Sequence, residues 1–274
     1  MTQVVVVTSR DNPLLQRIRK VNQDSAGYRK LGEIWLEGDH LCSASLIRGL
    51  PVAVAVIADT AWLGEGGLAP SHDPVAQKLS ELANRAAKIV VVPQGLWTSF
   101  TSLESPARIG FLVSYSAVGE GASGELAAGQ RTVVLDRLQD AGNVGSILRS
   151  ASALGVQQVV ALKGTAALWS QKVLRAGMGA HFALRLVEQV DSSALTQLGV
   201  PLVATSSHAD FSLHQAPLVD PCAWVMGHEG QGVAAAVMSQ CQYTVSIPQP
   251  GGEESLNVAA AAAVVLYESL RRRL

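Results

Sequence analysis

The sequence has few charged residues and almost no imbalance between them. Charged side chains make up 16% of the 274 residues, and 21 basic groups against 22 acidic groups leave a formal net charge of −1. Indiscriminate binding to polyanions is therefore not expected, although a local basic surface can exist within a neutral total.

Cysteines and long apolar runs are also scarce. The three cysteines, Cys42, Cys222 and Cys241, form no Cys-x-x-Cys pair and have no histidine at metal-ligand spacing, so neither a disulfide framework nor a metal site is expected. No apolar run approaches the roughly 20 residues that a membrane span needs. The first residues lack the basic start and apolar stretch of a secretory signal, so we expect a cytoplasmic protein with no membrane attachment.

The length and the composition along the chain indicate two domains. A chain of 274 residues exceeds the usual size of one compact domain, although one large α/β domain is an alternative. Residues 114–130 are rich in Gly, Ser and Ala and have weak periodicity, as in a linker. We therefore predict domains at 1–116 and 131–274, joined by a linker at 117–130.

Apolar runs alternate with helical patterns in both parts and predict an α/β fold. Upstream, strands are expected at 34–37, 52–58 and 89–93, with helices at 13–22, 40–48 and 74–87. Downstream, strands are expected at 132–135, 158–162, 183–187, 201–205, 223–226 and 243–248. Such Val-rich strands favour a largely parallel sheet covered on both faces, which binds ligands beyond the carboxyl ends of its strands.

The segment from Leu135 to Val156 follows a predicted strand and opens a helix. Asn143 suits the N-cap position, and apolar residues follow it at helical spacing. Arg149 falls nearly opposite this apolar stripe, so it should face solvent or a ligand. Taken alone, the segment needs no function to explain it, because capping asparagines and surface arginines are common.

A glycine-rich loop at 227–232, with the sequence GHEGQG, follows the predicted strand at 223–226. Gly227, Gly230 and Gly232 would let backbone amides approach a ligand closely, and Glu229 is the formal negative charge among them. The loop is not G-x-G-x-x-G, because Ala235 stands where the third glycine would fall, and it lacks the lysine of a P-loop. A plain tight turn is the alternative.

The last segment runs from a strand end at Ile247–Pro248 through a Pro/Gly loop into a helix. Ser255 is the expected cap, and the helix carries a stripe of Leu256, Ala260, Ala263, Tyr267 and Leu270. The opposite face is apolar as well, with Val258, Ala261, Ala262 and Val265. We therefore expect both faces to be buried, one against the sheet and the other against a partner such as a second subunit.

Together, the three segments resemble the motifs of the SpoU/TrmH family of SPOUT RNA 2′-O-ribose methyltransferases. The matching residues are Asn143-Val-Gly-Ser-Ile-Leu-Arg149, Gly227-His-Glu-Gly-Gln-Gly232, and Ile247-Pro248 followed by Ser255-Leu-Asn-Val258. The resemblance covers 131–274 closely, while 1–116 looks more loosely like the family's ribosomal-protein-like RNA-binding domain. Ala141 and Gln171 stand where proline is common in the family, and Gly177 stands where serine is frequent.

The resemblance implies methyl transfer from S-adenosyl-L-methionine to a ribose 2′-hydroxyl of RNA, by a C-terminal domain with a deep trefoil knot. By position, the residues implied to hold S-adenosyl-L-methionine are Thr205, Gly227, Ile247 and Leu256. Arg149 would clamp a phosphate and orient the hydroxyl, since an arginine stays protonated and is poorly suited to act as a base. The remaining polar lining would be Asn143, Glu229, Ser255 and Asn257, and which of them accepts the proton, if any does, is open. The resemblance also implies a homodimer through the C-terminal domain, with each active site completed across the interface.

RNA is the expected partner of the N-terminal part as well. Six cations lie between positions 10 and 30, and from this stretch we take Arg10, Asn12 and Arg29 as candidate RNA contacts. An ordinary solvated helix face would explain the same charges. An additional RNA-binding domain favours rRNA over tRNA, and an rRNA methyltransferase that confers antibiotic resistance remains an alternative.

Two other classes of function compete with this prediction. A knotted RNA-binding assembly protein that has lost catalysis would keep the fold, but intact Asn143, Arg149, Glu229 and Asn257 count against it. A nucleotide-dependent oxidoreductase on a Rossmann sheet is disfavoured by the missing glycine fingerprint and by the absence of an acidic residue placed for a ribose.

Overall fold

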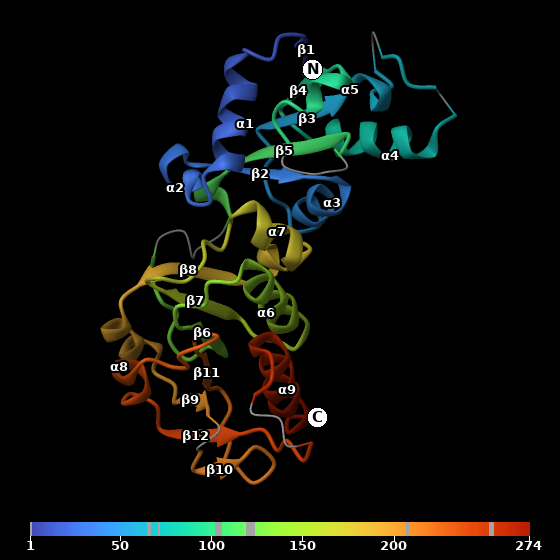
Figure 1. The fold of residues 1–274 in the computed structure, drawn as a ribbon. Helices are drawn as coiled ribbons and strands as arrows, with labels where there is room; N and C mark the ends of the chain where they lie inside the picture. Colours follow the sequence, from blue (N-terminus) through green and yellow to red (C-terminus); the bar gives the residue numbers. More distant parts are fainter. Residues whose placement is uncertain are drawn as a thin grey trace. The chain divides into compact units, whose positions relative to one another are not determined.

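The computed structural model describes residues 2–64, 67–70, 72–101, 106–118, 124–206, 209–251 and 255–274. The chain divides into two compact units, each combining helices with one sheet (Figure 1). Unit 1 comprises Met1–Val118 with Trp169–Gln171, and unit 2 comprises Gly119–Leu168 with Lys172–Leu274. No helix in the described ranges is long and apolar enough to cross a membrane.

Unit 1 contains a five-stranded mixed sheet in the order β1-β4-β3-β5-β2. Strands β1, β4 and β3 are parallel, whereas β5 pairs antiparallel with both β3 and β2. The strands are β1 (Gln3–Val6), β2 (Glu33–Glu37), β3 (Val54–Ala58), β4 (Lys88–Val92) and β5 (Ile109–Ser114). The helices are α1 (Pro13–Gln23), α2 (Gly27–Leu31), α3 (Asp39–Ile47), α4 (Pro74–Ala83) and α5 (Gln94–Trp97), with 3₁₀ turns η1 (Asp59–Ala61) and η2 (Tyr115–Ala117).

The predicted N-terminal strands and helices are all present, whereas the strands β1 and β5 and the short helices α2 and α5 were not predicted. Helix α1 begins as expected, because the Asn12 side chain accepts a hydrogen bond from the Leu14 amide and Pro13 fits the first helical turn. Strand β1 is a largely exposed edge strand, so it lacks the buried pattern that marks β2 to β4. Strand β5 is buried over most of its length and extends to Ser114, where the predicted linker-like segment begins.

Unit 2 contains a seven-stranded parallel sheet in the order β10-β12-β9-β11-β6-β7-β8, which confirms the predicted parallel arrangement. The strands are β6 (Thr132–Leu135), β7 (Gln158–Leu162), β8 (Arg185–Val190), β9 (Leu202–Thr205), β10 (Phe211–Ser212), β11 (Ala223–Met226) and β12 (Tyr243–Ser246). The helices that follow β6 along the chain are α6 (Ala141–Ala153), α7 (Gln171–Gly177), η4 (Ala180–Ala183), η5 (Ser192–Leu198), α8 (Ala235–Met238) and α9 (Val258–Arg271).

Helices cover both faces of this sheet. Helices α6 and α9 lie on one face, and η5 and α8 lie on the other (Figure 1). The predicted stripe of α6 is buried up to Ala151, and Leu154 at its end is half-buried. Gly145 in the same helix permits close packing, because a Cβ there would lie 2.4 Å from the Ala176 Cβ and 2.8 Å from the Gly177 amide nitrogen. On the other face, Val134, Val160 and Leu195 belong to one buried apolar cluster.

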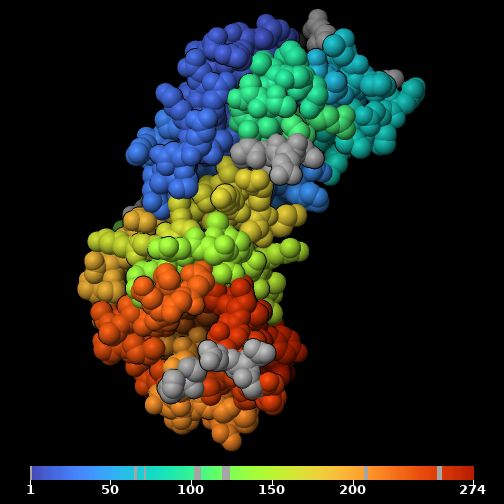
Figure 2. Space-filling view, viewed as in Figure 1, coloured from blue at the N-terminus to red at the C-terminus, as the bar shows by residue number. Residues whose placement is uncertain are grey.

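Helix α9 packs with only one of its two apolar faces. Ala262, Val265 and Leu266 are buried, whereas Val264 and Tyr267 are 40% and 57% exposed. The expected stripe through Tyr267 therefore points outward, and the opposite face packs on the body of unit 2. In Figure 2 the red residues of α9 lie at the surface of unit 2, close to the yellow-green residues of α6.

The predicted linker at 117–130 falls partly on residues 119–123, which lie outside the described residues. Its described end is bonded to unit 2. The Arg185 side chain donates to the Glu125 carbonyl at 2.9 Å, the Ala127 amide donates to the Gln158 side chain at 2.8 Å, and the Gly129 amide donates to the Leu198 carbonyl at 2.8 Å. Residues 125–129 therefore form part of the surface of unit 2.

Candidate functional site

A cavity of about 630 Å³ lies at the carboxyl ends of β9, β11 and β12. Three segments contribute to its lining: residues 205–206 at the end of β9, the loop at 227–233 after β11, and residues from the end of β12 to the first turn of α9. Thr205, Gly227, Ile247 and Leu256 all lie in this lining. The cavity has the size of a small-molecule site and stands where parallel α/β sheets bind ligands.

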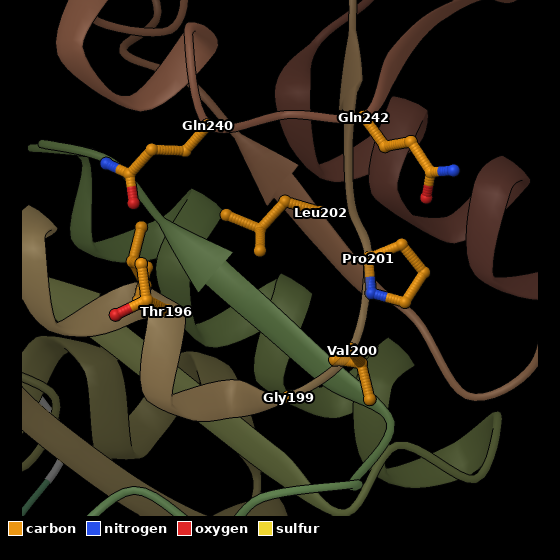
Figure 3. Close-up of a pocket in the computed structure, with 8 residues that line it drawn as sticks. Thr196, Gly199, Val200, Pro201, Leu202, Gln240 and Gln242 are labelled. Carbon is orange, nitrogen blue, oxygen red and sulfur yellow. The ribbon is translucent and has the colours of Figure 1, made fainter.

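A second cavity, of about 320 Å³, lies near the amino end of β9 (Figure 3). Thr196, Pro201 and Gln240 are among its lining residues, which include no charged side chain. The Gln240 amide nitrogen is already bonded to the carbonyls of Ser192 and Ala236. The first cavity is therefore the candidate site, because the candidate cofactor residues and polar groups of the second and third motifs line it.

A chain of side-chain hydrogen bonds connects the three motifs beside this cavity. The Asn257 amide nitrogen donates to the Asn143 side-chain oxygen at 3.0 Å, and the Asn143 amide nitrogen donates to Glu229 Oε1 at 3.3 Å. The Glu229 carboxylate also accepts from the backbone amides of Asp140 and Gln139, at 3.2 and 3.4 Å. The start of α6, the glycine-rich loop and the start of α9 are thus held together by side chains from positions far apart in the sequence.

Two predicted helix caps were wrong, and the difference matters for this network. Asp140 caps α6, where its side chain accepts from the Asn143 amide at 2.7 Å. Asn257 caps α9, where its side-chain oxygen accepts from the amides of Ala259 and Ala260 at 2.9 and 3.3 Å. Because Asn143 is not the cap, its side chain is available to Glu229 and Asn257. Ser255, the other expected cap, is instead an exposed residue of the cavity lining.

Glu229 is an anchored carboxylate. Partial burial raises its pKa, but hydrogen bonds from its own backbone amide, from the Asn143 side chain and from the amides of Asp140 and Gln139 outweigh that effect, so the pKa lies below its usual value. Glu229 is therefore ionised at neutral pH and is a weak base. Its contacts suit it to holding the loop against the start of α6.

The glycine-rich loop is a tight hairpin that uses its own amides. A Cβ on Gly227 would lie 2.4 Å from both the Gly232 carbonyl carbon and the Val233 nitrogen, so only glycine fits there. His228 and Gly232 exchange two backbone hydrogen bonds of 3.0 and 2.9 Å, and His228 Nδ1 accepts from the amides of Gly230 and Gln231. The expectation that the amides of Gly230 and Gly232 face a ligand was therefore wrong, and these amides are not available to a phosphate.

An ion pair between the buried Asp136 and the partly exposed Arg137 supports the loop from the end of β6, and it was not predicted. Arg137 Nε donates to Asp136 Oδ1 at 3.0 Å, while Asp136 Oδ2 accepts from the Ala234 amide at 2.6 Å. Arg137 also donates to the Gln231 side chain at 3.0 Å, and it has a left-handed backbone with φ of 59°. The available signal was an Asp-Arg pair directly after a buried strand, where a charge needs a partner.

Arg149 lies on the exposed side of α6, as predicted, but outside the lining of the cavity. It stands six residues after Asn143, which is about 9 Å along the helix axis. It makes no hydrogen bond or ion pair with any residue that the structure describes. Its guanidinium is therefore free to bind a phosphate.

The three candidate RNA contacts of unit 1 do not form one cluster. Arg10 precedes α1 and its side chain is 77% exposed, and Asn12 is occupied as the cap of that helix. Arg29 lies beyond the other end of α1, in α2, where its guanidinium stacks 5.2 Å from the centre of the Tyr28 ring. An RNA surface that includes both arginines therefore has to extend along α1, an 11-residue helix about 16 Å long.

No candidate metal site is found among the described residues. No group of three or more His, Cys, Asp or Glu side chains there is placed to hold a metal ion. The polar side chains that line the cavity are mainly amides and hydroxyls, together with His228 and the carboxylate of Glu229.

The fold and the site define an α/β protein that binds a small molecule at the carboxyl edge of a parallel sheet. The sequence model of the SpoU rRNA Methylase family matches residues 130–267. The chain therefore belongs to the SpoU rRNA methylase family.

Individual relatives extend this likeness over most of the chain. The chain is 30% identical to an uncharacterized tRNA/rRNA methyltransferase of Synechocystis sp., over 99% of this chain and 96% of that protein. It is 34% identical to the 23S rRNA (guanosine-2′-O-)-methyltransferase RlmB of Pseudomonas aeruginosa, over 77% of this chain and 88% of that one. Its fold resembles the crystal structure of the SpoU methyltransferase AviRb from Streptomyces viridochromogenes in complex with the cofactor AdoMet, with a TM-score of 0.81. The two sequences are 24% identical, and the match covers 96% of this chain and 98% of that chain.

Proposed function

We propose that this protein transfers a methyl group from S-adenosyl-L-methionine to a ribose 2′-hydroxyl of RNA, with rRNA favoured over tRNA. The observation that carries the proposal is a cavity of about 630 Å³ that is lined by two of the motifs, both of which are hydrogen-bonded to Asn143 of the first motif. The 2′-O-methyltransferase activity named for its Pseudomonas relative supports the reaction type, and the rRNA named there supports the substrate.

The cavity residues fit S-adenosyl-L-methionine. Ile247 and Leu256 contribute apolar surface to the lining, Thr205 contributes a hydroxyl, and Gly227 permits the close approach of the loop backbone. A loop whose amides are already bonded suits a ligand without phosphate groups. When bound, S-adenosyl-L-methionine supplies a methyl group already activated by a sulfonium.

The polar residues then orient the acceptor hydroxyl. We assign Arg149 as a clamp on the phosphate next to the target ribose, because its guanidinium is exposed, permanently charged and well shaped for phosphate. Ser255 and Asn257 form part of the polar lining, and Asn143 is held beside it by hydrogen bonds to Asn257 and Glu229. Glu229 holds Asn143 in position, since its lowered pKa makes it a poor proton acceptor.

We also propose a homodimer formed through unit 2. Two observations support it: Val264 and Tyr267 expose apolar surface on α9, and Arg149 lies outside the cavity of its own chain. A partner subunit would cover the helix and bring a second Arg149 to the site. Gel filtration with light scattering should give a dimer, and a monomer at micromolar concentration that still methylates RNA would contradict this assignment.

The knot, the RNA contacts and the cellular location complete the proposal. The parallel order β12-β9-β11-β6, in which strands consecutive in the chain are not neighbours, is compatible with the trefoil knot implied by the motifs. Unit 1 would grip the substrate through Arg10, Asn12 and Arg29, of which Arg10 is the most accessible. The cytoplasm is the proposed location, because the proposed substrate is rRNA.

Calorimetry and RNA mapping test the function. Calorimetry should detect S-adenosyl-L-methionine binding to the purified protein, and mapping of ribose methylation in total RNA should find one site that depends on the gene. For RNA assays of R149A, the control is R85A, which removes another exposed arginine far along the sequence. Failure to bind S-adenosyl-L-methionine would favour an RNA-binding protein that has lost catalysis.

A further inference from the structure

We propose that His228 is a positioning residue for the cofactor-binding loop, and that protonation of its imidazole weakens S-adenosyl-L-methionine binding. The inference rests on the proposed function, and it concerns a residue of the GHEGQG loop that lines the same cavity. His228 acts on the shape of the loop and is assigned no contact with the reacting atoms.

His228 takes part in several of the hydrogen bonds that hold this loop together. Its Nδ1 accepts from the Gly230 amide at 3.0 Å and from the Gln231 amide at 3.2 Å. Its own backbone amide donates to the Gly232 carbonyl at 3.0 Å, and its carbonyl accepts from the Gly232 amide at 2.9 Å. One residue therefore makes four of the hydrogen bonds that close the hairpin, two of them through a group that can be protonated.

The acceptor role fixes the protonation state of the ring. A neutral imidazole has one nitrogen that accepts and one that carries hydrogen, so acceptance at Nδ1 places the hydrogen on Nε2. In the protonated ring both nitrogens are donors, and two backbone N–H groups would then face a third N–H. Turning the ring over does not help, because it places a carbon at the same point. Protonation therefore removes both side-chain bonds and loosens the Gly230–Gln231 turn.

The other charged groups around the loop are held by contacts of a different kind. On the loop itself, Glu229 has a lowered pKa and stays ionised. From the segment after β6, Asp136 and Arg137 form an ion pair that bonds Ala234 and Gln231, and Arg137 keeps its charge at every relevant pH. Asp140 at the start of α6 is occupied as a helix cap.

The remaining wall of the cavity adds no formal charge. From the end of β12 and the start of α9, the described lining residues are apolar, amide or hydroxyl side chains. His228 is therefore the group bonded to this loop whose side-chain hydrogen bonds depend on its protonation state.

The sign of the pH effect follows from the bond pattern. The cofactor-bound loop needs the neutral ring, so binding favours the deprotonated form. S-adenosyl-L-methionine should therefore bind most tightly when the His228 ring of the free protein is neutral, and its affinity should fall as the ring becomes protonated. Once the ring is mostly protonated, coupling to one proton means that the dissociation constant rises by about tenfold for each further pH unit.

Substitution at position 228 separates this role from a general packing role. In H228N the side-chain oxygen is bonded to Cγ, as Nδ1 is in histidine, so it can accept the same two amides and cannot be protonated. H228Q places its amide group one atom further out, near Nε2, and H228L removes the acceptor while keeping bulk. H228N should therefore rescue the loop, whereas H228Q and H228L should not.

The experiment is calorimetry of S-adenosyl-L-methionine binding to the wild type and the three variants at pH 8.5, 7.5, 6.5 and 5.5, after circular dichroism has shown equal folding. The ligand's own amino group also titrates, but its effect is common to all four proteins and can be divided out. After this correction, the wild type should lose affinity as the pH falls, whereas the dissociation constant of H228N should stay within about threefold. H228Q and H228L should bind about tenfold more weakly than the wild type at pH 8.5.

Two results would overturn the inference and leave the proposed function standing: an H228N pH profile that matches the wild type, or an H228L variant that binds as tightly as the wild type at pH 8.5. Absence of binding by all four proteins at pH 8.5 would instead overturn the proposed function, and this inference with it.

Discussion

Asn257 has two separable tasks, and two substitutions should divide them. Its side-chain oxygen caps α9 through the amides of Ala259 and Ala260, while its nitrogen donates to Asn143. N257A removes both interactions. N257D keeps an oxygen for the cap, since Asp caps helices as well as Asn, but it removes the donor.

The expected stability changes follow from these contacts. Loss of the cap costs about 1 kcal/mol, and loss of the solvent-exposed bond to Asn143 costs about 0.5 kcal/mol. Because unit 2 is a domain of roughly 150 residues, 1 kcal/mol corresponds to a Tm shift of about 2–4 °C. We expect N257A to lower the Tm of this unit by about 3–6 °C and N257D to lower it by about 1–2 °C.

Activity should respond differently from stability. In N257D a carboxylate oxygen faces the Asn143 side-chain oxygen, and the Asn143 amide cannot simply turn over, because its nitrogen is bonded to Glu229. Both variants should therefore lose about tenfold or more in kcat/KM, equivalent to about 1.4 kcal/mol of transition-state stabilisation.

Differential scanning calorimetry gives the Tm, and transfer of labelled methyl groups to RNA from cells that lack the gene gives the activity. Full activity in N257D would refute the positioning role of the hydrogen-bonded chain. An unchanged Tm in N257A would refute the capping role.

Three further results are expected. G227A should abolish S-adenosyl-L-methionine binding in calorimetry, because the added Cβ would lie 2.4 Å from backbone atoms across the hairpin; retained binding would contradict the assigned site. R149A should lower kcat by about 100-fold or more while the cofactor dissociation constant stays the same, since Arg149 lies outside the cavity lining. E268Q should lower the Tm at pH 7, because hydrogen bonds from Arg271 and Arg272 stabilise the Glu268 carboxylate and lower its pKa from 4.5 to about 2. This stabilisation is lost as the carboxylate is protonated, so the difference in Tm from the wild type should close between about pH 4.5 and 2. Thermal scans at three pH values would test this.

The sequence predicted the strands of the parallel sheet well, because buried strands carry continuous apolar runs. Strand β6 at 132–135, β7 at 158–162 and β11 at 223–226 have the predicted bounds. Strand β1 was missed because an exposed edge strand needs no such run. The face of α9 that packs inward could not be chosen, since both faces are apolar and the sequence does not say which one meets the sheet.

The site residues were found by their motifs, but their bonds could not be derived from the sequence. Asn143 and Ser255 both suit a helix N-cap, and only the folded backbone shows that Asp140 and Asn257 occupy those positions. The role of His228 could not be predicted for a similar reason. The partners of Nδ1 are amides two and three residues away, and they face the ring only once the hairpin has closed.

The closed hairpin also bears on competition among metabolites. A cell contains many adenine nucleotides, and a cleft that accepts adenosine has to exclude those with a phosphate tail. Because the amides of His228, Gly230, Gln231 and Gly232 are already bonded within the turn, ATP would find few donors there to replace the water around its phosphates. Selectivity against nucleotides would then depend on the closed turn, in which the His228 side chain occupies two of the amides and the main chain occupies the other two.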